Sequence, residues 1–594
     1  MTSVENYFAP LPATTRGQPV RLTVDPTGTK VVYASGKSIV VRSLEDPSQA
    51  WEYTGHTAPT TVARFSPSGY YVASGDSSGK VRIWDAINDE HILKSEFQPI
   101  AGRVADIAWD GESQRVMAVG DGKGGFGHVF TFDSGNSVGT VMGHSKVINA
   151  CSMRQQRPFR AVTCSDDSTC VFYHGAPYKM AAVLRGHTGF VHDAQYAPSD
   201  EYFVTAGADG KLFLYDGKSG ECVRQVGAHE QGHTGSIYAA AWSPDSTRVV
   251  TVSGDRTCKF WDIAADKLVG SVEMGAGPEN MQVGCAWAGD RIVTLALSGD
   301  LSFLRCGAAA PERVVTGHQK SITAAAVTGG ALYTASYDGR VCAWDLDAGT
   351  ASVVAGAGSG GAVEAAAAHG AAVALASQDN TLRFVASDSV ARAVPLGAAA
   401  RSLAFADDAV VAVLQDDAVA LVRDSNVERL AIGGAARAVA ARGTAVAIGF
   451  ADSHVQLYKL RNSQLEPTVS IAAHSREITA LAFSDDGTLL ASGDAGGKIV
   501  VSRTDDASTV TTRWGAHTAR VYSIAWAADG DRAVSAALDG HVIVWSVSTP
   551  QHKHIVRNAH LGGAVAACFV GAHVVSTGAD GAVKVWAAAA KPGL

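Results

Sequence analysis

The chain has 594 residues, a formal net charge of −8, and 46% apolar against 18% charged residues. So much apolar material with so little charge excludes a mainly disordered chain. No long basic block is present, which argues against a protein that binds nucleic acid through its phosphates. At about 150 residues per domain, the length alone predicts roughly four domains.

Two further absences bear on the compartment. No apolar run reaches the length of about 18 residues that a membrane-spanning helix needs, and residues 1–12 lack the basic and apolar regions of a signal peptide. The nine cysteines are scattered and form no C-x-x-C pair. We therefore expect a cytoplasmic protein with reduced cysteines and no contact with membranes.

One phrase repeats along the chain: a small residue, Asp, often Gly, then alternating apolar residues that end in an aromatic residue and Asp. When weaker copies that have lost the aromatic residue are aligned with the strong ones, this position recurs fourteen times between residues 42 and 586, at a mean spacing of about 42 residues. Such alternation predicts a half-buried strand. The clearest copies are residues 79–85, 208–216, 254–262, 337–345, 538–545 and 579–586.

A second pattern runs in phase with the first. Short stretches of small apolar residues end in an aromatic residue and a turn, as expected for inner strands that crowd around an axis. Their aromatic ends are Phe65, Trp109, Tyr196, Trp242, Trp287, Phe405, Phe483, Trp526 and Phe569. Gly-His or Ala-His precedes most of these strands, at His56, His144, His187, His233, His318, His474, His517 and His560.

Together these signals resemble the WD40 repeat, in which about 42 residues form one four-stranded blade of a β-propeller. Fourteen copies cover almost the whole chain and divide naturally into two rings of seven. We therefore predict an all-β fold of two tandem seven-bladed propellers, the N-terminal one at residues 17–316 and the C-terminal one at residues 317–594.

The last blade lacks sequence for its outer strand. Residues 587–594 follow its aromatic-ended strand and include Lys-Pro-Gly, which is a poor strand sequence. Residues 5–10, ENYFAP, precede the first inner strand and are otherwise unassigned. Because an open sheet edge is a liability, we expect residues 1–16 to cross over and supply the outer strand that closes the second propeller.

Four polar positions recur within a blade: the Gly-His histidine, a serine two residues before the turn aspartate, that aspartate, and the strand aromatic. They include the residue types of a Ser-His-Asp catalytic triad. Recurrence at the blade period instead favours a buried, structural hydrogen-bonded tetrad. The candidate tetrads are His144–Ser165–Asp167–Tyr173, His233–Ser253–Asp255–Trp261 and His318–Ser336–Asp338–Trp344.

Other chemical motifs are weak. Gly122-x-Gly124-x-x-Gly127 fits a dinucleotide fingerprint, but a strand follows where that fingerprint needs a helix. His552 and His554 have no evident third metal ligand. A propeller enzyme that uses paired turn aspartates is a minor alternative, because most such aspartates cap turns. We expect no cofactor, no metal and no enzymatic activity.

Stretches outside the repeat pattern point to a family. Residues 5–19, 126–150, 157–179 and 237–262 are among those that resemble the actin-interacting protein 1 family, and the likeness is dense over residues 5–345. The resemblance implies a monomeric protein of the actin cytoskeleton. It also implies binding to actin filaments decorated with cofilin/ADF, and severing, capping and disassembly of those filaments without nucleotide hydrolysis.

The resemblance further implies contact residues on blades 3–5 of the first propeller. An acidic position falls on Asp121, where the family more often has Glu, and another falls on Asp167, which is also a tetrad candidate. Two aromatic positions fall on Tyr178 and Phe190. Because both lie in outer-strand or connecting segments, we expect them to be exposed and to anchor a partner.

The alternative is a WD40 scaffold of another assembly, such as a ubiquitin ligase or an RNA-processing complex. An appended helical motif, for instance an F-box-like segment, would favour it, and the sequence shows none.

Overall fold

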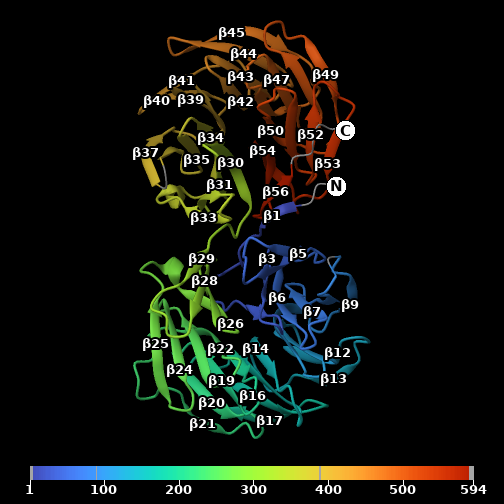
Figure 1. The fold of residues 1–594 in the computed structure, drawn as a ribbon, viewed down its shortest axis with the longest axis vertical. Coiled ribbons are helices and arrows are strands. Elements are labelled where there is room, and N and C mark those ends of the chain that lie inside the picture. Colours follow the sequence, from blue (N-terminus) through green and yellow to red (C-terminus); the bar gives the residue numbers. More distant parts are fainter. Residues whose placement is uncertain (1–3, 89, 387–388, 588–594) are drawn as a thin grey trace. The chain divides into compact units, whose positions relative to one another are not determined.

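The computed structural model describes residues 4–88, 90–386 and 389–587. In this part of the chain, 56 strands form fourteen antiparallel four-stranded sheets, and each sheet is one blade (Figure 1). The chain divides into two compact units. The prediction of an all-β fold with two seven-bladed propellers is confirmed, and the length-based expectation of four domains is wrong.

The first propeller contains blades 1–7 and one short 3-10 helix, η1 (Pro278–Asn280). Its blades are β2–β5 (Thr23–Val24, Lys30–Ser35, Ser38–Ser43, Ala50–Tyr53), β6–β9 (Thr60–Phe65, Tyr71–Asp76, Val81–Asp85, Leu93–Phe97), β10–β13 (Gly102–Trp109, Arg115–Gly122, Gly127–Thr131, Ser137–Thr140), β14–β17 (Ile148–Met153, Arg160–Ser165, Cys170–His174, Lys179–Leu184), β18–β21 (Val191–Tyr196, Tyr202–Gly207, Leu212–Asp216, Cys222–Gln225), β22–β25 (Ile237–Trp242, Arg248–Ser253, Thr257–Asp262, Lys267–Glu273) and β26–β29 (Gln282–Ala288, Arg291–Ala296, Leu301–Arg305, Arg313–Val315).

The second propeller contains blades 8–14 and the 3-10 helix η2 (Ala357–Gly360). Its blades are β30–β33 (Ile322–Thr328, Ala331–Ser336, Val341–Asp345, Thr350–Val353), β34–β37 (Val363–His369, Ala372–Ser377, Thr381–Ala386, Ser389–Pro395), β38–β41 (Ala400–Ala406, Ala409–Leu414, Val419–Arg423, Asn426–Leu430), β42–β45 (Ala436–Arg442, Ala445–Phe450, Val455–Arg461, Gln464–Ile471), β46–β49 (Ile478–Phe483, Leu489–Asp494, Ile499–Arg503, Thr509–Trp514), β50–β53 (Val521–Trp526, Arg532–Ala537, Val542–Ser546, Lys553–Val556) and β54–β56 (Ala564–Val570, His573–Gly578, Val583–Ala587) with β1 (Val4–Phe8).

Strand β1 is the fourth strand of blade 14. It pairs antiparallel with β56, from Val4 opposite Trp586 to Phe8 opposite Val583. Phe8 is buried, and its ring centroid lies 5.2 Å from that of Trp344 in blade 8. The N-terminal strand therefore covers the edge of β56 and also packs against the neighbouring blade.

The boundary between the units differs in one respect from the expectation. One unit spans Leu11–Val315, and the other joins the N-terminal residues up to Pro10 to the chain from Thr316 onward. Residues 11–16, which we expected in the crossing segment, thus belong to the first propeller. Leu11 is fully buried there, and its carbonyl accepts a hydrogen bond from Ser35 Oγ at 2.9 Å. Residues 1–3 and 588–594 of the expected ranges lie outside the described part.

The hydrophobic core consists of clusters that join neighbouring blades, because each strand directs alternate side chains toward the next sheet. One cluster joins blades 2 and 3 through Val62, Ile83 and Trp109. Another joins blades 9 and 10 almost entirely through Ala, Val and Leu. The nine cysteines are free thiols. No helix among the described residues is long and apolar enough to cross a membrane.

Candidate functional site: buried tetrads and the exposed surface of blades 3 to 5

Blade 6 shows the arrangement of a complete tetrad. His233 Nδ1 lies 3.0 Å from Asp255 Oδ2, and His233 Nε2 lies 2.8 Å from Thr251 Oγ1. Trp261 Nε1 donates to the same Thr251 oxygen at 2.8 Å. If the imidazole proton is on Nδ1, the chain of donors runs from Trp261 and Thr251 through His233 to the carboxylate. Such a satisfied chain fixes the blade and leaves no free nucleophile.

The hydroxyl in the three candidate tetrads is not the serine that we expected. Thr163, Thr251 and Thr334 contact the histidines instead, at 2.8, 2.8 and 2.6 Å. Ser165, Ser253 and Ser336 lie two residues further along, at the strand end. There Ser165 and Ser253 accept hydrogen bonds from the Asp167 and Asp255 amides, and Ser336 donates to Asp338. The assignment of these serines to tetrads is wrong, because they close the turn.

Residue alternation explains the error. The threonine and the serine are two positions apart on one strand, so both point to the same face. Only the threonine lies deep enough to contact the third-strand aromatic, as Trp344 does when it donates to Thr334 at 2.6 Å. The predicted spacing, with the tetrad serine two residues before the aspartate, is correct where the aspartate is itself the last residue of the strand. Ser74 and Asp76 of β7 are an example.

Further tetrads that the prediction missed follow the same geometry. The signal was present, because each begins with Gly-His or Ala-His. They are His56–Ser74–Asp76–Trp84, His517–Ser535–Asp539–Trp545 and His560–Ser576–Asp580–Trp586, with the shorter chains His187–Thr205–Asp209 and His474–Ser492–Asp494.

Blade 8 departs from the pattern. His318 Nε2 contacts Thr334, but His318 Nδ1 has no hydrogen-bond partner among the described residues, and Asp338 instead accepts from Ser336 and the Arg340 amide. Burial and the nearby Arg340 lower the pKa of His318 to about 3. This histidine is therefore neutral in the folded protein at physiological pH.

Asp167 is held within its blade. Its carboxylate lies 3.0 Å from His144 Nδ1 and accepts hydrogen bonds from the Ser145 amide and Thr169. Burial alone would raise the pKa of Asp167, but these hydrogen bonds and the histidine hold it below its ordinary value. Its side chain is about 10% exposed. Its atoms are thus committed to the tetrad, which supports the structural interpretation of this residue.

Tyr178 is buried, which contradicts the expectation that it is exposed. It is 3% exposed and belongs to a cluster with Met117, Val129 and Val141 of blade 3 and its outer loop. The Tyr178 backbone lies against Gly139 of β13, the outer strand of blade 3, so this residue faces a neighbouring sheet rather than solvent. Burial raises the pKa of the Tyr178 hydroxyl.

Phe190 is exposed, as expected. Its side chain is 47% exposed while its carbonyl accepts a hydrogen bond from the Ala208 amide at 2.7 Å. The Lys146 Nζ lies 5.6 Å from the centre of its ring. A fixed backbone with a free aromatic face beside a cation is suited to contact with a partner protein.

Asp121 is also exposed, near the end of β11. Its backbone pairs with Arg103 of β10, and a Cβ on the neighbouring Gly102 would lie 1.9 Å from the Asp121 carbonyl oxygen. Glycine is therefore required at residue 102 for this close approach. The Gly122–Gly127 motif forms the hairpin between β11 and β12, with no helix to receive a dinucleotide.

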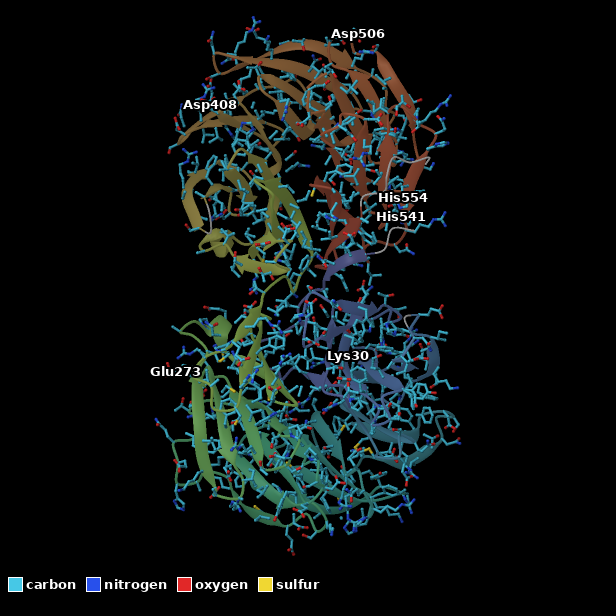
Figure 2. The ribbon with its side chains drawn as sticks, in the orientation of Figure 1. Lys30, Glu273, Asp408, Asp506, His541 and His554 are labelled. Atoms are coloured by element: carbon cyan, nitrogen blue, oxygen red, sulfur yellow. The ribbon has the colours of Figure 1, made fainter. Side chains whose placement is uncertain are left out.

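The histidine pair at residues 552 and 554 does not gain a third ligand. His554 lies on β53, next to β52, which begins just after His541 (Figure 2). Burial lowers the pKa of His554. Among the residues that the structure describes, no group of three His, Cys, Asp or Glu side chains could hold a metal ion.

Comparisons with known proteins identify the family. A model of the WD domain, G-beta repeat, matches residues 47–85, 135–174, 178–216, 220–262, 309–345, 465–501 and 508–546. The chain is 38% identical to actin-interacting protein 1 of Drosophila melanogaster, over 98% of this chain and 97% of that protein. The chain belongs to the actin-interacting protein 1 family.

Two other relatives also match this chain over almost their full lengths. WD repeat-containing protein 1 of Gallus gallus is 36% identical over 98% of both chains. The 66 kDa stress protein of Physarum polycephalum is 37% identical over 98% of this chain and 99% of its own length. Full-length coverage means that both propellers, including the Ala-rich blades 9–11 that the repeat model leaves unmatched, belong to the shared family architecture.

Within this family framework, the four residues that the resemblance implied separate into two pairs. Phe190 and Asp121 are exposed, whereas Tyr178 is buried and the Asp167 carboxylate is held within its tetrad. Of the four, only Phe190 and Asp121 are largely exposed.

Proposed function

We propose that this protein binds actin filaments together with cofilin/ADF and promotes their severing, capping and disassembly. The observation that carries the proposal is the 38% identity, over 98% of the chain, to a protein named for its interaction with actin. The proposed mechanism has no catalytic step. The protein acts as a cytoplasmic monomer of the actin cytoskeleton that stabilises broken or capped filaments by binding them more tightly than intact ones.

The proposed contact surface lies on blades 3–5 and centres on Phe190 and Asp121. A large exposed aromatic side chain can be desolvated at low entropic cost, and such residues commonly dominate binding energy. An exposed carboxylate adds orientation and salt dependence. Asp167 supports this surface indirectly, because it holds the loop that begins with Ser145 and Lys146 beside Phe190.

The test is cosedimentation of actin filaments with cofilin, with and without this protein. We expect the protein to shift actin to the supernatant only when cofilin is present, and Phe190→Ala and Asp121→Asn to reduce that shift without lowering the melting temperature. Tyr70→Ala is the matched control, because Tyr70 is an aromatic residue that is 62% exposed in the turn before β7 of blade 2, outside blades 3–5.

No cofilin-dependent shift would refute the proposal. Recovery of a ubiquitin-ligase or RNA-processing complex without actin would favour a scaffold role instead. Tyr178→Ala should unfold the protein at a lower temperature, because it removes a buried ring, at a cost of about 3–5 kcal/mol. A loss of activity in that variant would therefore carry no information about contact.

A further inference from the structure

Two methionine side chains are exposed on and beside blade 4. Met142 precedes β14 and is 67% exposed, and Met180 lies on β17 and is 52% exposed. The other methionines in the described ranges are buried or half-buried; they are Met117, Met153, Met274 and Met281. Because oxidants reach a thioether most easily when it is exposed, this pair is where methionine oxidation of the folded protein should begin.

The two methionines meet at Gly143. A Cβ on Gly143 would lie 2.7 Å from Met180 Sδ and 3.2 Å from Val171, so the Met180 sulfur packs directly on the backbone next to Met142. The Met142 carbonyl accepts a hydrogen bond from the Tyr173 hydroxyl at 2.8 Å. Tyr173 in turn pairs with Met180 across β16 and β17 (Figure 1). The Met180 thioether therefore helps to fix the chain at Met142.

The chain after this methionine pair reaches the proposed contact surface within four residues. We call residues 142–146 the blade-4 loop. Its Ser145 amide donates a hydrogen bond to Asp167 at 3.0 Å, and its Lys146 Nζ lies 5.6 Å from the centre of the Phe190 ring. A change at the methionine pair that loosens the start of the loop would therefore also move Lys146 relative to Phe190.

Hydrogen peroxide converts a methionine thioether to a sulfoxide. One peroxide oxygen bonds to the sulfur, the O–O bond breaks, and the other oxygen leaves as water, so the sulfur loses two electrons and the peroxide gains them. The sulfoxide is polar and bulkier than the thioether, and reductases convert it back. At Met180 it would replace the apolar packing on Gly143 by a polar group and so weaken that contact.

Most of the thiols are poorer targets for peroxide than this pair. The thiolate is the reactive form of cysteine, so a raised pKa protects the side chain. Burial raises the pKa of seven of the nine thiols, and among these is Cys222, the exposed one. The competing target is Cys306, because the Arg248 guanidinium lies 3.4 Å from its sulfur.

We propose that Met142 and Met180 form a peroxide-sensitive switch that regulates the contact surface of blades 3–5. Oxidation of the pair to sulfoxide loosens the blade-4 loop, moves Lys146 away from Phe190 and lowers the cofilin-dependent disassembly of filaments. Reduction of the sulfoxides restores it. The effect on actin rests on the function proposed above, whereas the modification and the loosening of the loop do not.

The first experiment maps the oxidation. The full-length protein is treated with hydrogen peroxide, the peroxide is removed with catalase, and oxidation is measured by peptide mass spectrometry. We expect Met142 and Met180 to be oxidised about tenfold faster than Met117 and Met153, because susceptibility follows exposure. Similar rates for the exposed and the buried methionines would overturn the proposal.

Hydrogen exchange then tests the loop. After peroxide treatment the blade-4 loop should exchange faster, and the double variant Met142→Leu/Met180→Leu should show no such change, because it keeps two apolar side chains but has no sulfur at these positions. Met180→Leu alone should retain most of this resistance, since Met180 is the sulfur that packs on Gly143. Unchanged exchange of the loop in the oxidised unmodified protein would overturn the proposal.

Cosedimentation with cofilin measures the regulation. Protein that was oxidised and freed of peroxide should shift several-fold less actin to the supernatant, and methionine sulfoxide reductase should restore the shift. The double leucine variant should keep its shift after peroxide. Met281→Leu, which replaces a half-buried methionine just before β26 of blade 7, is the matched control and should remain as sensitive as the unmodified protein.

Two outcomes separate this proposal from its neighbours. If Cys306→Ser makes the shift resistant to peroxide, the sensitive group is a thiol and the methionine switch is overturned. If the untreated protein gives no cofilin-dependent shift, the proposed function fails, and the exchange of the blade-4 loop before and after oxidation then decides on the switch alone.

Discussion

The two propellers share one repeat but stabilise their centres in different ways. In the first, Arg21 of blade 1 lies between Asp106 of blade 3 and Asp193 of blade 5, at 3.5 and 2.7 Å, and Arg64 of blade 2 also pairs with Asp106. This buried network links four blades across the ring. In the second, the corresponding space is a cavity of about 600 Å³ lined by the extra residues of seven β-bulges, one in each inner strand.

The difference extends to the blade interiors. Blades 9–11 lack the Gly-His signal, and the clusters between them are built from Ala, Val and Leu with few aromatic side chains. Small side chains allow close approach of neighbouring sheets without a tetrad. The comparison shows that propeller closure does not require one kind of core. Either a buried polar network or dense small-residue packing satisfies the same backbone geometry.

Removal of the N-terminal strand should have the largest effect, and only on the second propeller. Deletion of residues 1–8 removes β1 and exposes the edge of β56. The loss should exceed the about 3–5 kcal/mol expected for Phe8→Ala alone. Hydrogen-exchange mass spectrometry reads each propeller separately. Val4→Thr, at an exposed strand position, is the control, and unchanged exchange in blade 14 would show that β1 is dispensable.

Arg21→Ala should destabilise the first propeller only, by about 3–5 kcal/mol, because it leaves Asp106 and Asp193 buried without their shared cation. Urea denaturation followed by hydrogen exchange would measure the loss. Arg305→Ala is the control, because Arg305 pairs with Asp290 and Glu312 at the surface, where an ion pair contributes about 0–1 kcal/mol. Equal losses for the two variants would contradict a structural role for the network.

Acid should destabilise both propellers. Burial lowers the pKa of His192 in the first to about 4 and that of His318 in the second to about 3. These histidines are neutral when folded, so their contribution is complete above the unfolded pKa of about 6.5 and is lost as the pH falls toward the folded values. Each should cost about 1.4 kcal/mol per pH unit in that window. Calorimetry from pH 7 to 4.5 would detect this, and a flat stability profile would refute it.

The smallest effect separates the two hydroxyls of blade 6. Thr251→Val leaves His233 and Trp261 without their shared partner and should cost about 1–3 kcal/mol, whereas Ser253→Ala removes one turn hydrogen bond worth about 0.5–1.5 kcal/mol. Thermal unfolding of the two variants, side by side, gives the comparison. A larger loss for Ser253→Ala would restore the serine to the tetrad.

The sequence was sufficient to predict the fold class and the blade count, because the period of about 42 residues can be followed even through copies whose strand end has lost its aromatic residue. It could not place the tetrad hydroxyl. Thr251 and Ser253 face the same side of one strand. Which of the two hydroxyls contacts His233 depends on how deeply the imidazole lies in the blade.

The sequence also could not decide which aromatic side chains outside the inner strands are exposed. Tyr178 and Phe190 both lie in outer-strand or connecting segments, yet Tyr178 is buried in a cluster with residues of blade 3, whereas Phe190 is 47% exposed. Whether such a residue is buried depends on how one blade packs against the next, and the sequence of a single repeat does not determine that packing.

The pairing of β1 with β56 also has a consequence for synthesis. Residues 4–8 leave the ribosome before residues 583–587, which follow about 575 positions later. At about 5–20 residues per second, the N-terminal strand waits roughly 30 seconds to two minutes for its partner, while the whole first propeller can fold in between. During that interval a short segment with two aromatic residues, Tyr7 and Phe8, lacks its native partner, and blade 14 cannot be completed until β56 has been synthesised.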